Sequence, residues 1–315
     1  LSLFLHRMFE ASAVSKGNSD LVQDQLRNVK FICACDRTFA ALRRDGTIVT
    51  WGYEPNPFEK TYRAPSLTNV IHLEASDGAF AALLADGSVA TWGKEEDGAD
   101  SSMVQDQLKN VKRIYPGARA FAALLEDGSV ISWGDPENGG DSSDVRGQLR
   151  EVVNITASYG AFAARRADGS IVTWGYESDG GRHNVEDQLK EVQFVAATAS
   201  AFAAVTPHGL VTWGHPLHGG YLPPSEMNSK PVVELASTRS AFAAMLADGS
   251  VLTWGGPSFG GDSSSVQDRL TNVQKIKGSG NAFAALRADG SLVTWGTPIA
   301  GGDSSAVSSD DLQNL

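Results

Sequence analysis

Cysteine is scarce in this chain, and its scarcity limits the covalent chemistry. Of 315 residues only Cys33 and Cys35 are cysteines. Side chains at i and i+2 of a strand point the same way but sit too close along one chain to bridge comfortably. Two thiols supply neither a disulfide framework nor a zinc site, so we expect two small core residues and no metal or cofactor. This fits a reducing intracellular compartment or organelle interior, and the sequence does not say which.

Positive charge and long apolar runs are also in short supply. Against 37 Asp and Glu there are 26 Lys and Arg, a net charge of −11. An acidic surface repels a phosphate backbone, so no nucleic-acid partner is expected. No run of 18 apolar residues occurs, which argues against a membrane-spanning helix. The interrupted apolar stretch at the start is too short for a signal sequence, so residues 1–20 are expected to be an arm or leader remnant before a single domain of residues 21–315.

Motifs for catalysis and metal binding are weak. Among six histidines, only His215 and His218 approach a metal-ligand spacing, and no Cys or paired carboxylate stands close in sequence to complete a site. The recurring Gly-Gly-Asp-Ser-Ser segments could suggest calcium or phosphate, but one Asp per repeat does not supply six to eight converging oxygens. Gly, Asp and Ser are also the residues of turns. We therefore expect turns in these segments, no catalytic residue, and a protein that is not an enzyme.

A repeat of about 41 residues dominates what is present. Each tryptophan of the chain is followed by glycine and preceded by a Phe-Ala-Ala block, and the tryptophans are 41, 41, 41, 39, 41 and 41 residues apart. A fixed period of this length is typical of repeat architectures. The seven tryptophans are Trp51, Trp92, Trp133, Trp174, Trp213, Trp254 and Trp295.

Within one repeat the pattern predicts a β-hairpin. The apolar run at residues 79–84 leads through Asp86-Gly87 into a second run that ends at Trp92. Asp-Gly between two apolar runs is a strong hairpin signal, and we expect the type I′ turn, in which both residues take a positive φ. Six repeats carry Asp-Gly, while the fifth has His208-Gly209.

The remaining segments of the repeat complete the expected blade. Neither face of the hairpin strands is charged, so each sheet should be covered on both sides. Alanine suits the crowding near a central axis, and the segment Val104–Val111 is expected to supply a third or fourth strand. Four short strands per period indicate an all-β, seven-bladed β-propeller. The copy of that segment at residues 22–29 is expected to pair with the last blade and so close the ring.

The stretch Ala82 to Gly93 resembles the second half of the RCC1 repeat, which reads Leu-x-x-Asp-Gly-x-Val-x-x-Trp-Gly at its end. The resemblance covers nearly the whole chain from about Val22, and the regular units are similar to the RCC1/HERC-like arrays of algal proteins related to ubiquitin ligases. The first half of the motif departs, since the family's His-Ser-Leu is Ala79-Phe80-Ala81 here. The resemblance implies a propeller fold. It does not carry over activities that depend on particular surface residues.

Function is expected to lie where repeats differ. Loops at residues 53–66 and 215–231 replace the usual Gly-Gly-Asp-Ser-Ser and are rich in proline and aromatic residues. We interpret the chain as a non-catalytic protein-interaction scaffold, for which a subunit of a larger assembly is one form. The alternative explanation of the two loops is neutral drift of their blades from the repeat. A guanine-nucleotide exchange factor for a small GTPase and a substrate-binding domain of a ubiquitin-ligase-like protein remain open. The expected partner contacts are Tyr53, Phe58, Tyr62, Tyr221 and Leu222.

The tryptophans should be wedges between blades and not a platform for a ligand. Replacing Trp133 with alanine should therefore lower the free energy of unfolding by about 3–5 kcal/mol, the usual cost of removing a large aromatic side chain from a core. Denaturant unfolding of the variant measures this loss. Ready quenching of most indoles by a soluble quencher would contradict the packing.

Overall fold

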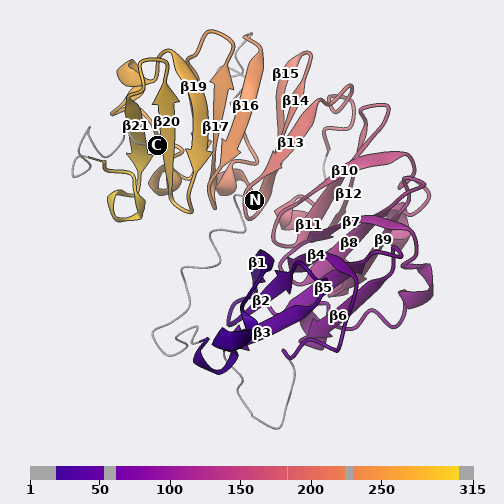
Figure 1. Cartoon of the computed structure of the whole chain (residues 1–315). Helices are drawn as coiled ribbons and strands as arrows, with labels where there is room; N and C mark the ends of the chain where they lie inside the picture. Colours follow the sequence, from indigo (N-terminus) through magenta and orange to yellow (C-terminus); the bar gives the residue numbers. More distant parts are fainter. Residues whose placement is uncertain (1–18, 53–61, 183, 224–229, 305–315) are drawn as a thin grey trace. The chain divides into compact units, whose positions relative to one another are not determined.

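The computed structural model describes residues 19–52, 62–182, 184–223 and 230–304. The described chain folds into seven antiparallel sheets of three strands each, linked by short helical turns (Figure 1). The fold is therefore all-β, with seven blades. None of the helices in these ranges is long and apolar enough to cross a membrane. The described residues form two compact units, residues 19–167 with 172–176 and residues 168–171 with 177–304.

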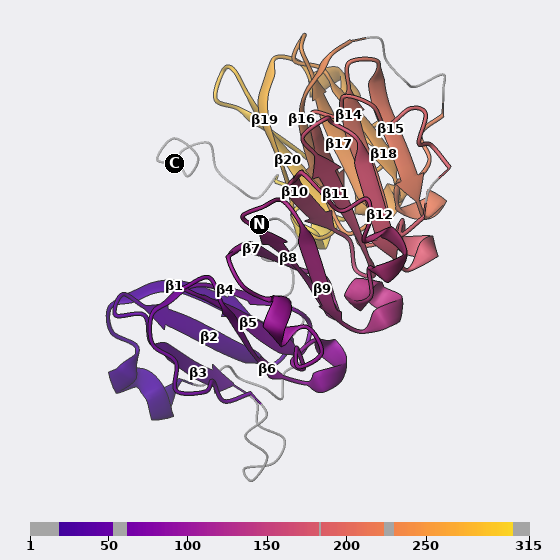
Figure 2. The ribbon, with the colours of Figure 1, turned by 90° about the vertical axis from the view of Figure 1, so that its right-hand side faces the viewer.

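The first unit holds blades one to four, whose strands follow one another in chain order within each sheet (Figure 2). Its strands are β1 Val29–Ala34, β2 Thr38–Arg43, β3 Ile48–Gly52, β4 Val70–Ala75, β5 Ala79–Leu84, β6 Val89–Gly93, β7 Val111–Pro116, β8 Ala120–Leu125, β9 Val130–Gly134, β10 Val152–Ala157, β11 Ala161–Arg166 and β12 Ile171–Gly175. Its helical turns are η1 Asp20–Gln25, η2 Glu95–Asp97, η3 Gln105–Gln107, η4 Pro136–Gly140 and η5 Ser143–Val145.

The second unit holds blades five to seven, built on the same plan. Its strands are β13 Phe194–Ala197, β14 Ala201–Thr206, β15 Gly209–Gly214, β16 Val232–Ser237, β17 Ala241–Leu246, β18 Val251–Gly255, β19 Val273–Gly278, β20 Ala282–Arg287 and β21 Leu292–Gly296. Its helical turns are η6 Glu177–Asp179, η7 Pro216–His218, η8 Pro257–Phe259, η9 Gln267–Arg269 and η10 Pro298–Ala300.

A stacked Phe–Trp pair forms the centre of each blade. Phe121 of β8 pairs with Trp133 of β9 in the strand register, and their ring centroids are 5.3 Å apart with nearly parallel planes. The other six blades repeat this pair with centroids 5.2–5.3 Å apart. Six of the tryptophans are buried as expected, while Trp51 of the first blade is only partly buried.

Five of the tryptophans also donate a hydrogen bond to the loop that precedes their blade. The Trp133 indole N–H donates to the carbonyl of Gly98, which lies in the loop of the preceding blade. Trp174, Trp213, Trp254 and Trp295 donate in the same way at 2.9–3.2 Å. Burial makes these bonds expensive to leave unmade. The aromatic pairs thus hold successive blades of a unit together.

A second set of contacts between blades is made by backbone alone. The loop between the first two strands of one blade donates an N–H to the matching carbonyl of the next, as from Asp36 to Asp77 and from Asp77 to Ala118. In the second unit Ala199 donates to Arg239, and Arg239 to Gly280. The first strands of successive blades in a unit accordingly contact one another, β1 with β4 and β16 with β19.

Two expectations about strands are wrong. Each blade has three strands and not four, because Val104–Val111 forms the short helical turn η3 and then a positive-φ residue, Asn110, before β7 begins. Likewise residues 20–25 form η1, and Val29 begins β1, which pairs with β2 of its own blade. The strand expected at residues 22–29 for ring closure is therefore not formed.

The alanine-rich strand is the middle strand of each blade, and most of its alanines are buried. One finer detail also differs. The hairpin turns are type I with a following glycine, because among the turn residues only Gly87 and its equivalents have a positive φ. The Asp86 side chain instead accepts hydrogen bonds from the Ser88 N–H and hydroxyl, which keeps Asp86 out of the type I′ geometry.

The glycine that follows each helical turn has no room for a side chain. Gly139 has φ +91°, and a Cβ atom there would lie 2.6 Å from Cδ2 of Phe162 in the next blade. Gly139→Ala should therefore lower the free energy of unfolding by at least about 1–2 kcal/mol. Gly147→Ala is the matched control in the same unit, because nothing lies within 4 Å of a Cβ there. Equal melting temperatures for the two variants would contradict this close packing.

Candidate partner-binding loops

The loop after each Trp-Gly pair follows a common frame, shown by the second blade. After η2 comes Gly98 with φ +101°, and the Asp100 carboxylate then accepts from the Ser102 N–H. The Ser101 hydroxyl donates to Gln105, whose amide donates to the Val89 carbonyl. The sixth blade repeats this network through Ser263, Gln267 and Val251. The Asp and Ser side chains of these segments are thus engaged in turns, as their composition indicates.

The fifth loop, after Trp213, keeps the frame but changes its surface. Pro216–His218 form η7, and Gly219 follows with φ +93°. Leu217 and Tyr221 are 74% and 60% exposed. Leu222 is only 1% exposed and packs with Leu210, Phe242 and Trp254 in the core. Leu222 therefore anchors the loop to the blade, while Tyr221 offers its ring to solvent. Residues 224–229 of this loop lie outside the described residues.

Two histidines of the fifth loop contact each other, and one of them contacts the next blade. The rings of His215 and His218 meet edge to face at 4.8 Å, and Nδ1 of His218 lies 3.2 Å from the Ser240 hydroxyl of the next blade. Burial, followed by repulsion from His215, lowers the pKa of His218, with Asp179 opposing the shift. Within the described ranges no group of three or more metal-binding side chains includes this pair. The histidines thus join the loop to the neighbouring blade.

The first loop, after Trp51, is described only from Tyr62 onward. Tyr53 and Phe58, two of the expected contacts, lie outside the described residues. Tyr62 is 5% exposed, and burial raises its pKa to about 12, with the nearby Cys35 and Asp97 adding to the shift and Arg37 opposing it. The Tyr62 ring is therefore a packing group in this structure and not an exposed contact.

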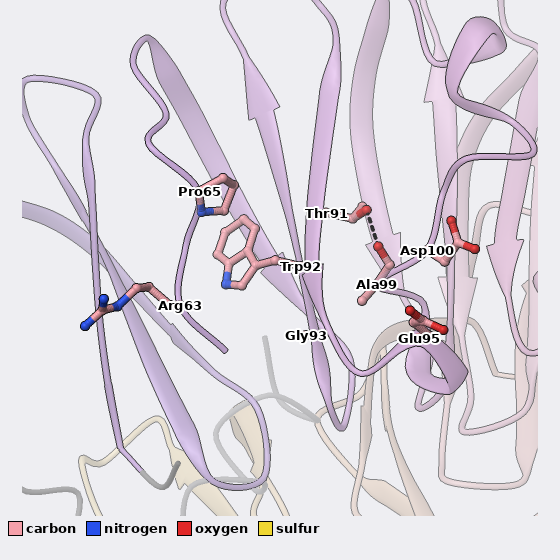
Figure 3. A pocket seen from close by; sticks show the side chains of 8 residues that line it. All are labelled: Arg63, Pro65, Thr91, Trp92, Gly93, Glu95, Ala99 and Asp100. Atoms are coloured by element: carbon pink, nitrogen blue, oxygen red, sulfur yellow. Dashed lines mark hydrogen bonds between the residues drawn. The ribbon is translucent and has the colours of Figure 1, made fainter. Parts of the chain in front are cut away.

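A pocket of about 500 Å³ opens beside the end of this loop (Figure 3). Arg63 and Pro65 line it on one side of Trp92, and Glu95 and Asp100 line it on the other. The buried Trp92 indole nitrogen has no hydrogen-bond partner, unlike the five tryptophans that donate to a glycine carbonyl. The loop before blade two includes residues 53–61, which lie outside the described residues, so the comparison with the five donors is limited to the described part of the chain.

An ion network joins the second and third blades next to this pocket. The buried Asp97 carboxylate accepts from Arg119 Nε at 3.0 Å, and Arg119 also reaches Asp135 at 3.0 Å. The hydrogen bond to Asp97 is the main cause of a raised Arg119 pKa. The fourth loop also carries Asp at this position, Asp179, but the residue equivalent to Arg119 in the following blade is Ser200, which has no guanidinium to complete such a network.

Sequence reasoning missed Leu217, the most exposed large apolar residue of the fifth loop. The signal was present in the alignment of repeats, because Pro216-Leu217-His218 stands where the sixth blade has Pro257-Ser258-Phe259. The same position holds Ile299 in the seventh blade, which is 99% exposed. An apolar residue at a position that is serine in another repeat indicates a difference in the surface of the two loops. The overall proline and aromatic content of the loop does not identify this position.

Comparisons with known proteins place the chain only broadly. No protein-family model and no curated protein matches it. Similar solved structures include the ectodomain of receptor kinase CR4 from Physcomitrella patens, with 18% identity and TM-score 0.47 over 82% of this chain and 70% of that one. The CRINKLY WD40 ectodomain of Arabidopsis thaliana ACR4 has 18% identity and TM-score 0.46, covering 82% and 93%. Prp20p from Saccharomyces cerevisiae has 15% identity and TM-score 0.46, covering 76% and 74%. Scores below 0.5 support no inference about the site, so the seven-blade architecture rests on the sheets of this chain.

The histidine contacts predict a pH-dependent fifth loop. Because the folded-state pKa of His218 is below its ordinary value, the unfolded chain binds more protons as pH falls from neutral through that ordinary value. Stability should therefore be complete above about pH 7 and decrease on acidification toward the folded-state pKa. Melting curves of the wild type and of His218→Gln measure this, and the variant should lose part of the pH dependence. An NMR titration that places the His218 pKa above 6.5 would contradict the burial of its ring.

Proposed function

We propose that this chain is a non-catalytic protein-binding propeller of RCC1-like repeats, with a place as a subunit of a larger assembly among the roles open to it. The observation that supports this most is the difference between the fifth loop and the loops at the same place in the second and sixth blades. In the second and sixth blades the polar groups of the loop bond to one another. The fifth loop keeps the helical turn and Gly219 of the frame, has Leu222 in place of the frame's serine, and exposes Leu217 and Tyr221.

An exposed aromatic beside an exposed aliphatic side chain is typical of a protein contact. Aromatic residues are enriched at interfaces because they bury a large area with few rotatable bonds. Leu222 and the His218–Ser240 contact hold the backbone beneath the two side chains, so little ordering is required when a partner binds. Of the five contacts expected from sequence, we keep Tyr221 as a direct contact, Leu222 and Tyr62 as buried supports, and Tyr53 and Phe58 as untested members.

Nucleotide exchange on a small GTPase is the second candidate. Prp20p, whose crystal structure was studied with its binding to Gsp1p and histones, shares the general architecture at low similarity. The RCC1 resemblance ties exchange to a β-wedge inserted in one blade. Each blade of this chain has three strands, and the described segments between blades are close to uniform in length, which disfavours such an insertion. Release of labelled GDP from a small GTPase at the intrinsic rate would support the scaffold, and acceleration would support exchange.

Replacing Leu217 with serine and Tyr221 with aspartate tests the scaffold proposal. These are the residues that the sixth blade carries at the same positions, Ser258 and Asp262, so the fold and melting temperature should not change. Recovery of partner proteins from native extract should fall by about tenfold or more, because the exposed apolar contacts are lost.

Met103→Ser is the matched control for the loss of apolar surface, because Met103 is 91% exposed and lies outside both divergent loops. The control should recover the same partners as the wild type. Full recovery with the double variant would mean that the fifth loop has merely drifted from the repeat.

A further inference from the structure

The first strands of blades one to four present a second surface, made of residues that belong to neither divergent loop. Each strand has a β-bulge at its second residue, where the register with the middle strand shifts. A bulge leaves one residue unpaired and re-aims its side chain. We call the second and third residues of these strands the inner row: Lys30, Phe31, Ile71, His72, Lys112, Arg113, Val153 and Asn154.

Contacts across the blades join the inner row into one surface. The Phe31 ring lies 5.4 Å from the His72 ring of the next blade. In the third blade Arg113 lies over the Tyr115 ring at 4.9 Å, and the Tyr115 hydroxyl donates to the Asn154 side chain of the fourth blade at 3.3 Å. Backbone bonds between the neighbouring loops hold these strands in fixed register.

The inner row is basic and apolar on an otherwise acidic protein. Strands β1, β4, β7 and β10 carry Lys30, Lys112 and Arg113 against Glu74, a net charge of 3 − 1 = +2, whereas the whole chain has −11. The Glu74 side chain is 15% exposed and bonded to His72 at 2.7 Å, so it offers little charge to solvent. In the second and fourth blades, the apolar side chains of Ile71 and Val153 are 46% and 45% exposed.

We propose that the inner row binds an extended acidic peptide whose carboxylates alternate with apolar side chains. The basic residues complement the carboxylates, and a guanidinium such as that of Arg113 can hold a carboxylate through two parallel bonds. Phe31, Ile71 and Val153 offer apolar surface to the side chains in between. A ligand of phosphate groups alone would leave this apolar surface unused, and the net charge of −11 opposes a polyanion of higher charge density.

Fluorescence anisotropy of the full chain with a fluorescein-labelled peptide of alternating glutamate and leucine tests the proposal. The wild type should bind this peptide saturably, less tightly at high salt. It should not bind a peptide with lysine in place of glutamate. The double variant Lys112→Glu with Arg113→Glu should weaken binding by about tenfold or more, since reversal turns attraction into repulsion. Circular dichroism and melting confirm that the variant is folded.

Lys109→Glu is the matched control, an exposed residue of the same blade just before β7. It should weaken binding no more than about twofold, because exposed charges away from the contact contribute little. Equal losses in the control and the double variant would overturn the proposal, as would saturable binding of inorganic polyphosphate without binding of the glutamate–leucine peptide. The Leu217→Ser, Tyr221→Asp chain should bind the peptide normally, so this test is independent of the fifth loop.

Discussion

The contact on which the rest of this structure depends is the stacked Phe–Trp pair and the bond from its indole to the preceding blade. Phe162 and Trp174 stack in the centre of one blade. Phe162 also packs closely against Gly139 in the loop of the preceding blade, and the Trp174 indole N–H donates a hydrogen bond to the Gly139 carbonyl. A small sheet of three strands is marginal alone, so contact with its neighbours stabilises it. The same Phe–Trp pair packs the inside of its blade and joins the blade to its neighbour. The residues between successive pairs can therefore vary with less effect on the fold.

That freedom explains why the divergent loops do not disturb the fold. The fifth loop keeps Gly219, which fits against Phe242, and replaces the serine of the regular loops with Leu222, which fills the core. The exposed side chains of this loop, Leu217 and Tyr221, do not pack in the core. Binding of a partner therefore explains an apolar residue at these positions better than packing does. The second blade differs, because among the described residues the Trp92 indole has no hydrogen-bond partner, and a charged pair, Asp97 with Arg119, joins the blade to the next one.

The number of blades and the pairing of the hairpins could be predicted from the sequence, because the period of the Trp-Gly motif and the Asp-Gly turns depend on local chemistry. The turn type could not be predicted. Asp86 can either take a positive φ or accept hydrogen bonds with its side chain, and the hydroxyl of Ser88 favours the second arrangement. The expected fourth strand was wrong because the apolar residues Val104, Leu108 and Val111 are four and three residues apart, a spacing that suits a helical turn packed on a sheet and not a strand. Tyr221 and Leu222 are adjacent in sequence, yet Tyr221 is exposed and Leu222 is buried. Only the tertiary packing decides which of the two faces solvent.

The central claim is that regular loops serve the fold while the fifth loop meets a partner. Amide hydrogen exchange with and without the captured partner tests this most directly, because it reports the contact region without a substitution. The account predicts new protection at residues 215–223 and no change at the matching residues 256–264 of the sixth blade. Protection spread over the regular loops, with none at residues 215–223, would contradict it.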